Sequence, residues 1–311
     1  MTRGVGRRGI GRPGRSAWGV GTAVLLLLLL WLGKLVTIGG AMSTNGTFTT
    51  HKSLLAQEAH ASPAPRAESR LRLATYNIHW GLGADGVHDL ERTAAVLKAI
   101  DADIVLLNEV DVNWRRSGNA DQAAYLAAAA GYPYVYFGPA LRTWASGGLG
   151  VSLYGNALLS RFPLQDARTV RLPVGPGREP RAAVAAEVEL KGATVTVLGT
   201  HLGLSRSDRL AQTARLVELA AARNGPVVLM GDFNAQPGAP EIRHLLAAGL
   251  VDASELAGDP GPGPTFPAAN PRARIDYVFV SPDLAGRVEA AGPWPADASD
   301  HLPVVVDLTW P

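Results

Sequence analysis

The segment VVLMGDFN, residues 227–234, decides how the rest of the chain is interpreted. An apolar run of β-forming residues leads into Gly231, and a carboxylate and an amide follow at Asp232 and Asn234. A buried strand would carry both polar side chains to the edge of a sheet, on one face. Gly231 would let the backbone turn or approach another segment closely. A strand followed by an Asx turn explains the same residues without any function.

Composition and charge limit the classes of protein that the chain can represent. The 311 residues are 47% apolar and 18% charged, enough for one large domain or two small ones. The chain has no cysteine, so a metal site would use oxygen and nitrogen ligands, which suit Mg²⁺, Mn²⁺ or Ca²⁺. Residues 1–69 hold eight Lys/Arg and two Asp/Glu, and the remaining residues hold 21 Lys/Arg and 25 Asp/Glu. The basic excess typical of non-specific nucleic-acid binding is therefore confined to the N-terminal part.

The N-terminal part has the pattern of a membrane-targeting segment. Five arginines within residues 1–16 precede a largely apolar stretch at 17–42, which Gly33 and Lys34 interrupt. We predict a basic cytoplasmic tail (1–16), a transmembrane signal anchor or signal peptide (17–42), a flexible linker (43–69) and a folded domain (70–311). The uncleaved anchor is preferred because no clear cleavage site follows the apolar run closely. In either case the positive-inside rule places the folded domain outside the cytoplasm, tethered or secreted.

The remaining chain alternates between strand-like and helix-like segments. About ten strands and four helices, with hairpins and crossovers mixed, predict an α/β domain of two packed sheets flanked by helices. A helix at 208–223 is expected to bury Leu210, Ala214, Val217 and Ala221. Residues 147–155 are expected to form a glycine-rich loop.

Polar side chains lie close to the ends of apolar strands in six segments. Taken singly, each is explained by a turn or by a solvated surface residue. Open sheets nevertheless gather functional groups at strand ends, and six such coincidences predict a shared site. The residues are Asn77, Glu109, His201, Asp232 with Asn234, Asp276, and Asp300 with His301.

The same segments carry a resemblance to a known superfamily. The motifs are YNI (76–78), NE (108–109), GTH (199–201), GDFN (231–234), IDY (275–277) and SDH (299–301). In this order they resemble the endonuclease/exonuclease/phosphatase superfamily, which includes deoxyribonuclease I, and the chain looks like a small bacterial membrane-anchored member. The resemblance implies a four-layer α/β sandwich of two mixed β-sheets between helices. It also implies that residues 70–311 are a catalytic domain for Mg²⁺-dependent cleavage of a phosphate ester, with Mn²⁺ as an alternative.

The resemblance further implies a metal site built from oxygen ligands. Glu109 would be the principal ligand, Asn77 would support it, and Asp300 would be a further ligand. The metal would act as a Lewis acid on the phosphoryl oxygens.

Catalytic roles follow from the resemblance as well. Asp276 and His301 would form a carboxylate–imidazole pair that stabilises the phosphate in the transition state or moves a proton. Asp232 would orient or deprotonate the attacking water. Asn234 and His201 would donate hydrogen bonds to the non-bridging oxygens.

Further residues are candidates for substrate binding. His79 follows Asn77 by two positions, so an extended chain would place both on one face. Arg181 could clamp an anion together with Arg178, and a solvated loop is the alternative. Asn156 is preferred to the nearby Tyr154 as a contact for the phosphate.

The interpretation that follows is a monomeric, membrane-anchored phosphodiesterase that acts outside the cytoplasm on lipid head groups or other small diesters. The acidic domain and the membrane tether motivate this choice. One alternative is an extracytoplasmic nuclease, and another is an inactive binding module that keeps the fold. The presence of Glu109, Asp232, Asp276 and His301 argues against the inactive module.

Overall fold

A computed structural model of the protein describes residues 70–145, 150–258 and 260–310. The predicted cytoplasmic tail, apolar segment and linker fall in residues 1–69 and so lie outside the described residues. Within the described part of the chain, no helix combines the length and the apolar character that crossing a bilayer would require.

The described strands form two mixed sheets of six strands each, and both sheets contain one parallel pair. The first sheet has the order β11 (Val288–Pro293), β12 (Val304–Thr309), β1 (Arg70–Asn77), β2 (Ile104–Val112), β4 (Val151–Ser160), β3 (Tyr134–Trp144). The second has the order β5 (Leu164–Arg171), β6 (Ala182–Leu190), β7 (Ala193–His201), β8 (Val227–Asp232), β10 (Asp276–Val280), β9 (Val251–Asp252).

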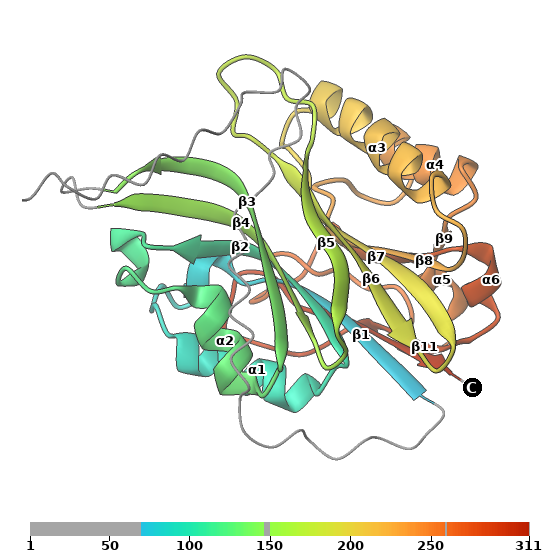
Figure 1. The fold of residues 1–311 in the computed structure, drawn as a ribbon, viewed down its shortest axis with the longest axis horizontal. Helices are drawn as coiled ribbons and strands as arrows, with labels where there is room; N and C mark the ends of the chain where they lie inside the picture. The colour runs from blue at the N-terminus through green and yellow to red at the C-terminus, as the bar shows by residue number, and fades with distance from the viewer. Residues whose placement is uncertain (1–69, 146–149, 259, 311) are drawn as a thin grey trace, which may run out of the picture. The chain divides into compact units, whose positions relative to one another are not determined.

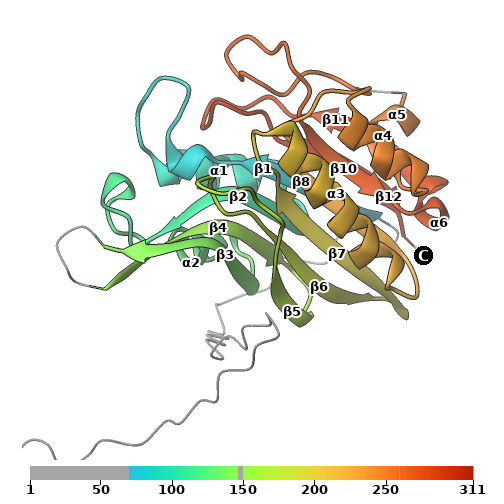
Figure 2. The ribbon, with the colours of Figure 1, turned by 90° about the horizontal axis from the view of Figure 1, so that it is seen from above.

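Helices cover the outer faces of both sheets. The first sheet is covered by α1 (Leu90–Ile100) and α2 (Gln122–Ala130), and the second by α3 (Arg206–Ala221) and α4 (Pro240–Ala247) (Figure 1 and Figure 2). The short helices α5 (Ala253–Leu256) and α6 (Pro282–Ala285) lie beside the second sheet. The four layers confirm the predicted α/β sandwich.

The alternation of side chains along the strands creates three hydrophobic cores. Leu73 of β1 joins the core between the sheets, whereas Tyr76 joins the core beneath α1 and α2. In β8, Met230 faces the core between the sheets and Leu229 faces α3 and α4. Because the side-chain period of a strand is two residues, the polar residues that follow in phase with Leu73 and Met230 also point between the sheets. The strand pattern therefore aims Asn77 and Asp232 at each other.

The predicted glycine-rich loop at 147–155 is wrong in its described part. Residues 151–155 belong to β4 and pair with β2 and β3. Gly155 is needed for close packing rather than for a loop, because a Cβ there would lie 2.2 Å from the backbone oxygen of Gly138. Strands β5, β9 and β11 were not predicted from the sequence; β5 and β9 are edge strands of the second sheet and β11 of the first.

The predicted buried face of α3 is also wrong. The helix buries Gln212, Thr213, Leu216 and Leu219, whereas Leu210 is 37% exposed. The side chain of Gln212 explains the rotation, because Oε1 accepts a hydrogen bond from the Gly203 amide (2.8 Å) and Nε2 donates to the carbonyl of Pro173 (2.8 Å). A polar residue that satisfies two loop groups thus occupies a buried position that hydrophobicity alone assigns to an apolar residue.

Gly231 supplies a test of the packing between β7 and β8. Its φ is +145°, and a Cβ would lie 1.8 Å from the carbonyl oxygen of Thr200. We expect Gly231→Ala to lower the free energy of unfolding by about 2 kcal/mol or more, because the backbone must shift. Gly286→Ala is the control, since its φ is −72° and no atom lies within 4 Å of the new Cβ. Urea unfolding measures both, and equal effects would contradict the close approach.

Candidate active site

Neighbouring strands of both sheets carry polar side chains at the same end of the sandwich. In the first sheet Asn77 is paired in register with Asn108, and in the second sheet Asp232 is paired with both His201 and Asp276. Each of these five residues is at least 95% buried. The apolar core between the sheets is therefore replaced at this end by a buried polar cluster.

The carboxylate of Asp232 is the centre of this cluster. Its Oδ2 atom accepts a hydrogen bond from Asn77 Nδ2 (3.1 Å) and lies 3.3 Å from His201 Nε2 and 3.9 Å from His301 Nε2. Asn77 Nδ2 also donates to Glu109 Oε1 (3.1 Å). One amide thus joins a carboxylate of the first sheet to a carboxylate of the second, and the structure brings the predicted residues together.

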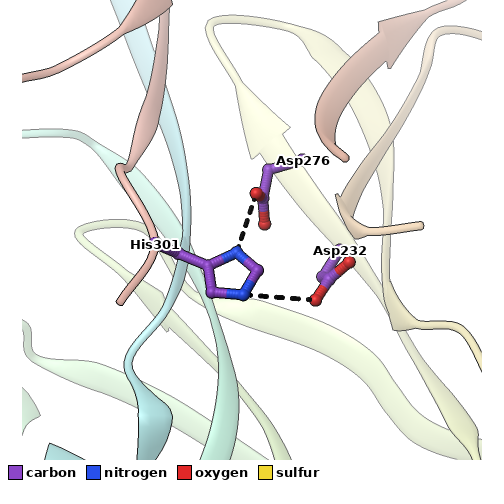
Figure 3. A group of neighbouring side chains, drawn as sticks. All are labelled: Asp232, Asp276 and His301. Carbon is purple, nitrogen blue, oxygen red and sulfur yellow. Dashed lines mark hydrogen bonds and ion pairs between the residues drawn. The ribbon is translucent and has the colours of Figure 1, made fainter. Parts of the chain in front are cut away.

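His301 and Asp276 form the carboxylate–imidazole pair that the sequence predicts. The Nδ1 atom of His301 lies 2.9 Å from Oδ2 of Asp276, and the opposite ring nitrogen faces Asp232 (Figure 3). The hydroxyl of Thr265 donates to the same Asp276 oxygen at 2.6 Å. Ser299 holds the loop before β12, since its hydroxyl donates to the Asn77 carbonyl (2.7 Å).

The buried charges shift the proton affinities of this cluster. Burial and then repulsion from Asp276 raise the pKa of Asp232 to about 7. Burial alone would lower the pKa of His301, but the negative charge and hydrogen bond of Asp276, with other carboxylates nearby, raise it to about 10. Burial, followed by the positive charges of Arg181 and His301, holds the pKa of His201 well below its usual value. The two histidines therefore carry different charges at neutral pH.

Asn234 and His201 lie together on the second sheet. Asn234 Nδ2 is 3.1 Å from His201 Nε2 and donates to the carbonyl of Leu202 (3.0 Å). The backbone amide of Asn234 donates a hydrogen bond to Asp232 Oδ1 (2.8 Å), and the φ of Asn234 is +49°. The Asx turn considered for this segment is therefore present, and the same residues belong to the polar cluster. Their contact with a phosphate stays a prediction.

Glu109 projects from an irregularity in β2. The register between β2 and β4 shifts between Leu107 and Val110, and Glu109 has a φ of +60°. Such a bulge redirects a side chain away from the regular ladder. His79 contacts both Asp300 and Asn77. Its Nδ1 atom lies 3.4 Å from Asp300 Oδ1, and its backbone amide donates a hydrogen bond to Asn77 Oδ1 (3.1 Å).

The donor atoms of the cluster are suited to a divalent metal ion. Among the described residues, Asp232, Asp276 and His301 each offer one ligand atom within 4.8 Å of the others, so they could hold a metal. Glu109 and Asp300 are only partly buried and offer further hard oxygens. Asn77 turns its Nδ2 rather than its Oδ1 towards the carboxylates, so its role as a metal ligand stays a prediction that requires the amide to turn.

The remaining predicted substrate contacts differ in their surroundings. Asn156 bridges the sheets, because its Oδ1 accepts from Asn108 (2.8 Å) and its Nδ2 donates to the Ala182 carbonyl (2.9 Å). Arg178 donates a hydrogen bond to Asp208 (2.7 Å) at the start of α3. This contact ties its loop to the helix. Arg181 is buried next to the polar cluster.

Two residues that sequence reasoning left without a role are central to the geometry. Asn108 donates to Asn156 and to the carbonyl of Thr200 (2.9 Å), and it accepts from the amide of Asp232 (3.0 Å). Its position in the NE motif was the available signal. Thr265 lies in a Pro/Gly-rich loop, and nothing in its sequence neighbourhood indicates that it contacts Asp276.

The fold and this cluster define the class of protein. Two mixed sheets packed between helices, with carboxylates, imidazoles and amides gathered at one end, form a deoxyribonuclease I-like sandwich. Residues 74–301 match the model of the Endonuclease/Exonuclease/phosphatase family, and the chain belongs to this family. Members of the family hydrolyse phosphate-ester bonds, so the chain is a phosphoester hydrolase.

Similar proteins support the assignment. The crystal structure of an endonuclease/exonuclease/phosphatase from Beutenbergia cavernae DSM 12333 is 32% identical, covers 78% of this chain and 72% of that one, and has a TM-score of 0.66. The uncharacterized protein YbhP of Escherichia coli K12 is 27% identical over 264 residues, which are 79% of this chain and 99% of that protein. The mannosyl-6-phosphatase Bt3783 of Bacteroides thetaiotaomicron VPI-5482 shares the fold at 19% identity, with a TM-score of 0.59 and coverage of 76% and 98%.

The bridging role of Asn108 can be tested by substitution. Asn108→Leu removes the partners of three buried groups at the junction of the sheets, and we expect it to lower the free energy of unfolding by about 3 kcal/mol. Asn270→Leu makes the same chemical change at an exposed position and is expected to alter stability by less than about 0.5 kcal/mol. Urea unfolding compares the two. A neutral effect of Asn108→Leu would show that the junction does not depend on this amide.

Proposed function

We propose that the protein is a Mg²⁺-dependent phosphodiesterase that acts outside the cytoplasm on lipid head groups or other small diesters. The observation that carries this proposal is the arrangement around Asp232. Its carboxylate lies between a carboxylate-paired imidazole, His301, and an amide, Asn77, that also holds Glu109. A base for water, a cation for the phosphate and a hard oxygen ligand thus meet at one place.

The side chains divide the chemistry among them. Asp232 accepts a hydrogen bond from the attacking water and orients it towards phosphorus. His301, held in one orientation by Asp276, points its other ring nitrogen into the cluster and stabilises the negative charge that the phosphoryl oxygens carry. Asn234 and His201 complete the set of groups around these oxygens. Because every member is fixed by neighbours before substrate arrives, little reorganisation is needed in the transition state.

A bound Mg²⁺ would polarise the phosphoryl oxygens as a Lewis acid. We place it with Glu109 and Asp300 rather than with Asp276 and His301. The last two are already committed to each other by a 2.9 Å hydrogen bond, and Asp276 also accepts from Thr265. Glu109 and Asp300 are only partly buried, which leaves their oxygens accessible to a hydrated ion. Mn²⁺ prefers the same oxygen ligands and would serve as an alternative.

Two exposed apolar side chains support a substrate at a lipid surface. Trp144 ends β3 and is 79% exposed, and Leu204 follows β7 and is 78% exposed. Both β3 and β7 end at the same end of the sandwich as the polar cluster. Exposed apolar side chains at this end of the sandwich suit contact with a membrane interface. The acidic balance of residues 70–311 disfavours nucleic acid as the alternative substrate.

Metal dependence is the first test of the proposal. We expect EDTA to abolish hydrolysis of bis(p-nitrophenyl) phosphate, and Mg²⁺ or Mn²⁺ to restore it. Glu109→Gln removes a negative ligand, so it should raise the Mg²⁺ concentration for half-maximal activity by at least about tenfold. Glu218→Gln, which changes a 63% exposed carboxylate in the last turns of α3, should leave this concentration unchanged. Full activity in EDTA, or identical titrations for Glu109→Gln and the wild type, would exclude the metal site.

The substrate class is tested by direct comparison. Phospholipid vesicles, glycerophosphodiesters and plasmid DNA are incubated with the protein and Mg²⁺ at low salt, and Asp232→Asn serves as the inactive control. We expect release of lipid head groups or glycerol phosphate, and a rate reduced by at least about 10³-fold in Asp232→Asn. Rapid cleavage of DNA with no action on the diesters would favour the nuclease. Equal rates for wild type and Asp232→Asn would assign any activity to a contaminant.

A further inference from the structure

Arg181 is a buried cation with few partners. Its side chain is 8% exposed, and its Nε atom has no hydrogen-bond partner among the described residues. The ion pair that it makes is with Glu179, whose carboxylate lies 2.9 Å from Nη1 and is itself 46% exposed. A buried guanidinium is normally bound on several sides, because its desolvation is costly. The surroundings of Arg181 therefore satisfy only part of its hydrogen-bonding capacity.

The backbone around Arg181 is held firmly beside the polar cluster. Its carbonyl accepts a hydrogen bond from the Leu172 amide (2.9 Å), and the next carbonyl, of Ala182, accepts from Asn156 (2.9 Å). Strand β6 then pairs Ala183 with Thr200, the residue before His201. The start of β6 is thereby fixed next to the end of β7, so the backbone of Arg181 has a defined position there.

The neighbours of Arg181 include Tyr154 and His201. Tyr154 is 93% buried and lies two residues before Asn156 in β4, so both side chains are on the face of the strand that meets the start of β6, where Asn156 binds the Ala182 carbonyl. Arg181 is also close enough to His201 for its charge to lower the pKa of that imidazole, after the larger effect of burial. Arg181 thus has Tyr154 of the first sheet and His201 of the second sheet as neighbours.

Arg178, three residues earlier, shows what a merely structural arginine in this segment does. It binds Asp208 at 2.7 Å and Ser207 at 3.1 Å, both at the start of α3. The partner of Arg178 is a buried carboxylate that accepts a second bond from the Gly175 amide. The partner of Arg181 is an exposed carboxylate, which water can solvate when a ligand takes its place on the guanidinium.

We propose that Arg181 and the hydroxyl of Tyr154 form a second anion-binding position beside the reacting phosphate, and that Glu179 occupies this position in the free enzyme. The inference rests on the proposed function in that it takes the cluster around Asp232 as the place where the phosphate reacts. The substrates would then be phosphodiesters that carry a further phosphate on one of the two esterified groups. Arginine suits this role because its planar fork binds phosphate oxygens in pairs.

Two soluble diesters that differ by one phosphate test the proposal. Glycerophosphoinositol and glycerophosphoinositol 4-phosphate are titrated into the full-length chain in EDTA, and binding is measured by calorimetry. We expect the wild type to bind the 4-phosphate at least about tenfold more tightly, and Arg181→Gln to reduce this ratio to about one. Glu179→Gln removes the competing carboxylate and should strengthen binding of the 4-phosphate by about threefold. Arg178→Gln is the matched control and should keep the wild-type ratio.

Several results would overturn the second anion position. Equal affinity of the wild type for the two diesters, or no measurable binding of either, would do so. Equal weakening of both diesters in Arg181→Gln would mean that Arg181 contacts the reacting phosphate instead. If circular dichroism shows that Arg181→Gln does not fold, the exposed Glu179→Gln variant becomes the test. Unchanged or weaker binding of the 4-phosphate by Glu179→Gln would contradict the proposed competition between Glu179 and the second phosphate. The measurement needs neither Mg²⁺ nor turnover, so a lack of hydrolysis would contradict the proposed function alone.

Discussion

The two sheets are joined at the active end by amide side chains that hydrogen-bond across the gap between them. Asn108 of the first sheet binds three groups at this junction, and Asn77 links Glu109 to Asp232. These groups are buried, so each unmade hydrogen bond would cost the full desolvation of a polar atom. The carboxylates and imidazoles depend on this framework, because without it the same end of the sandwich would have to be apolar.

The framework also explains why charges can remain in the interior. The 2.9 Å bond between Asp276 and His301 pairs one carboxylate with a cation, and the Asn77 amide stabilises the remaining negative charges. The backbone is held in unusual conformations at the same place, with a φ of +60° at Glu109 and +49° at Asn234. Strained residues of this kind persist only where their surroundings determine them strongly, and they cluster at functional sites. The polar junction and the strain therefore belong to one preorganised arrangement.

Local signals in the sequence predicted much of the fold and part of the site. Asp89 and Asp121 cap α1 and α2, because their side chains accept hydrogen bonds from backbone amides three residues later. Polar residues at strand ends predicted the cluster, because a strand with a two-residue period carries its last side chains in phase with the core. The errors arose where packing overrides composition. Gly155 lies within a strand because of a backbone contact with Gly138, and α3 buries Gln212 because two loop groups need its amide.

The strand and helix pattern, the family motifs and the residue types available for phosphate chemistry can be predicted from the amino-acid sequence, since they depend on neighbours in the chain. Which polar groups meet depends on the tertiary structure. It separated Arg178, tied to α3, from Arg181, buried beside Tyr154, and it brought Thr265 to Asp276. It also showed that Asn77 presents its Nδ2 to two carboxylates from different sheets. Such contacts depend on how two sheets pack and on their register, which residues far apart in the chain set jointly.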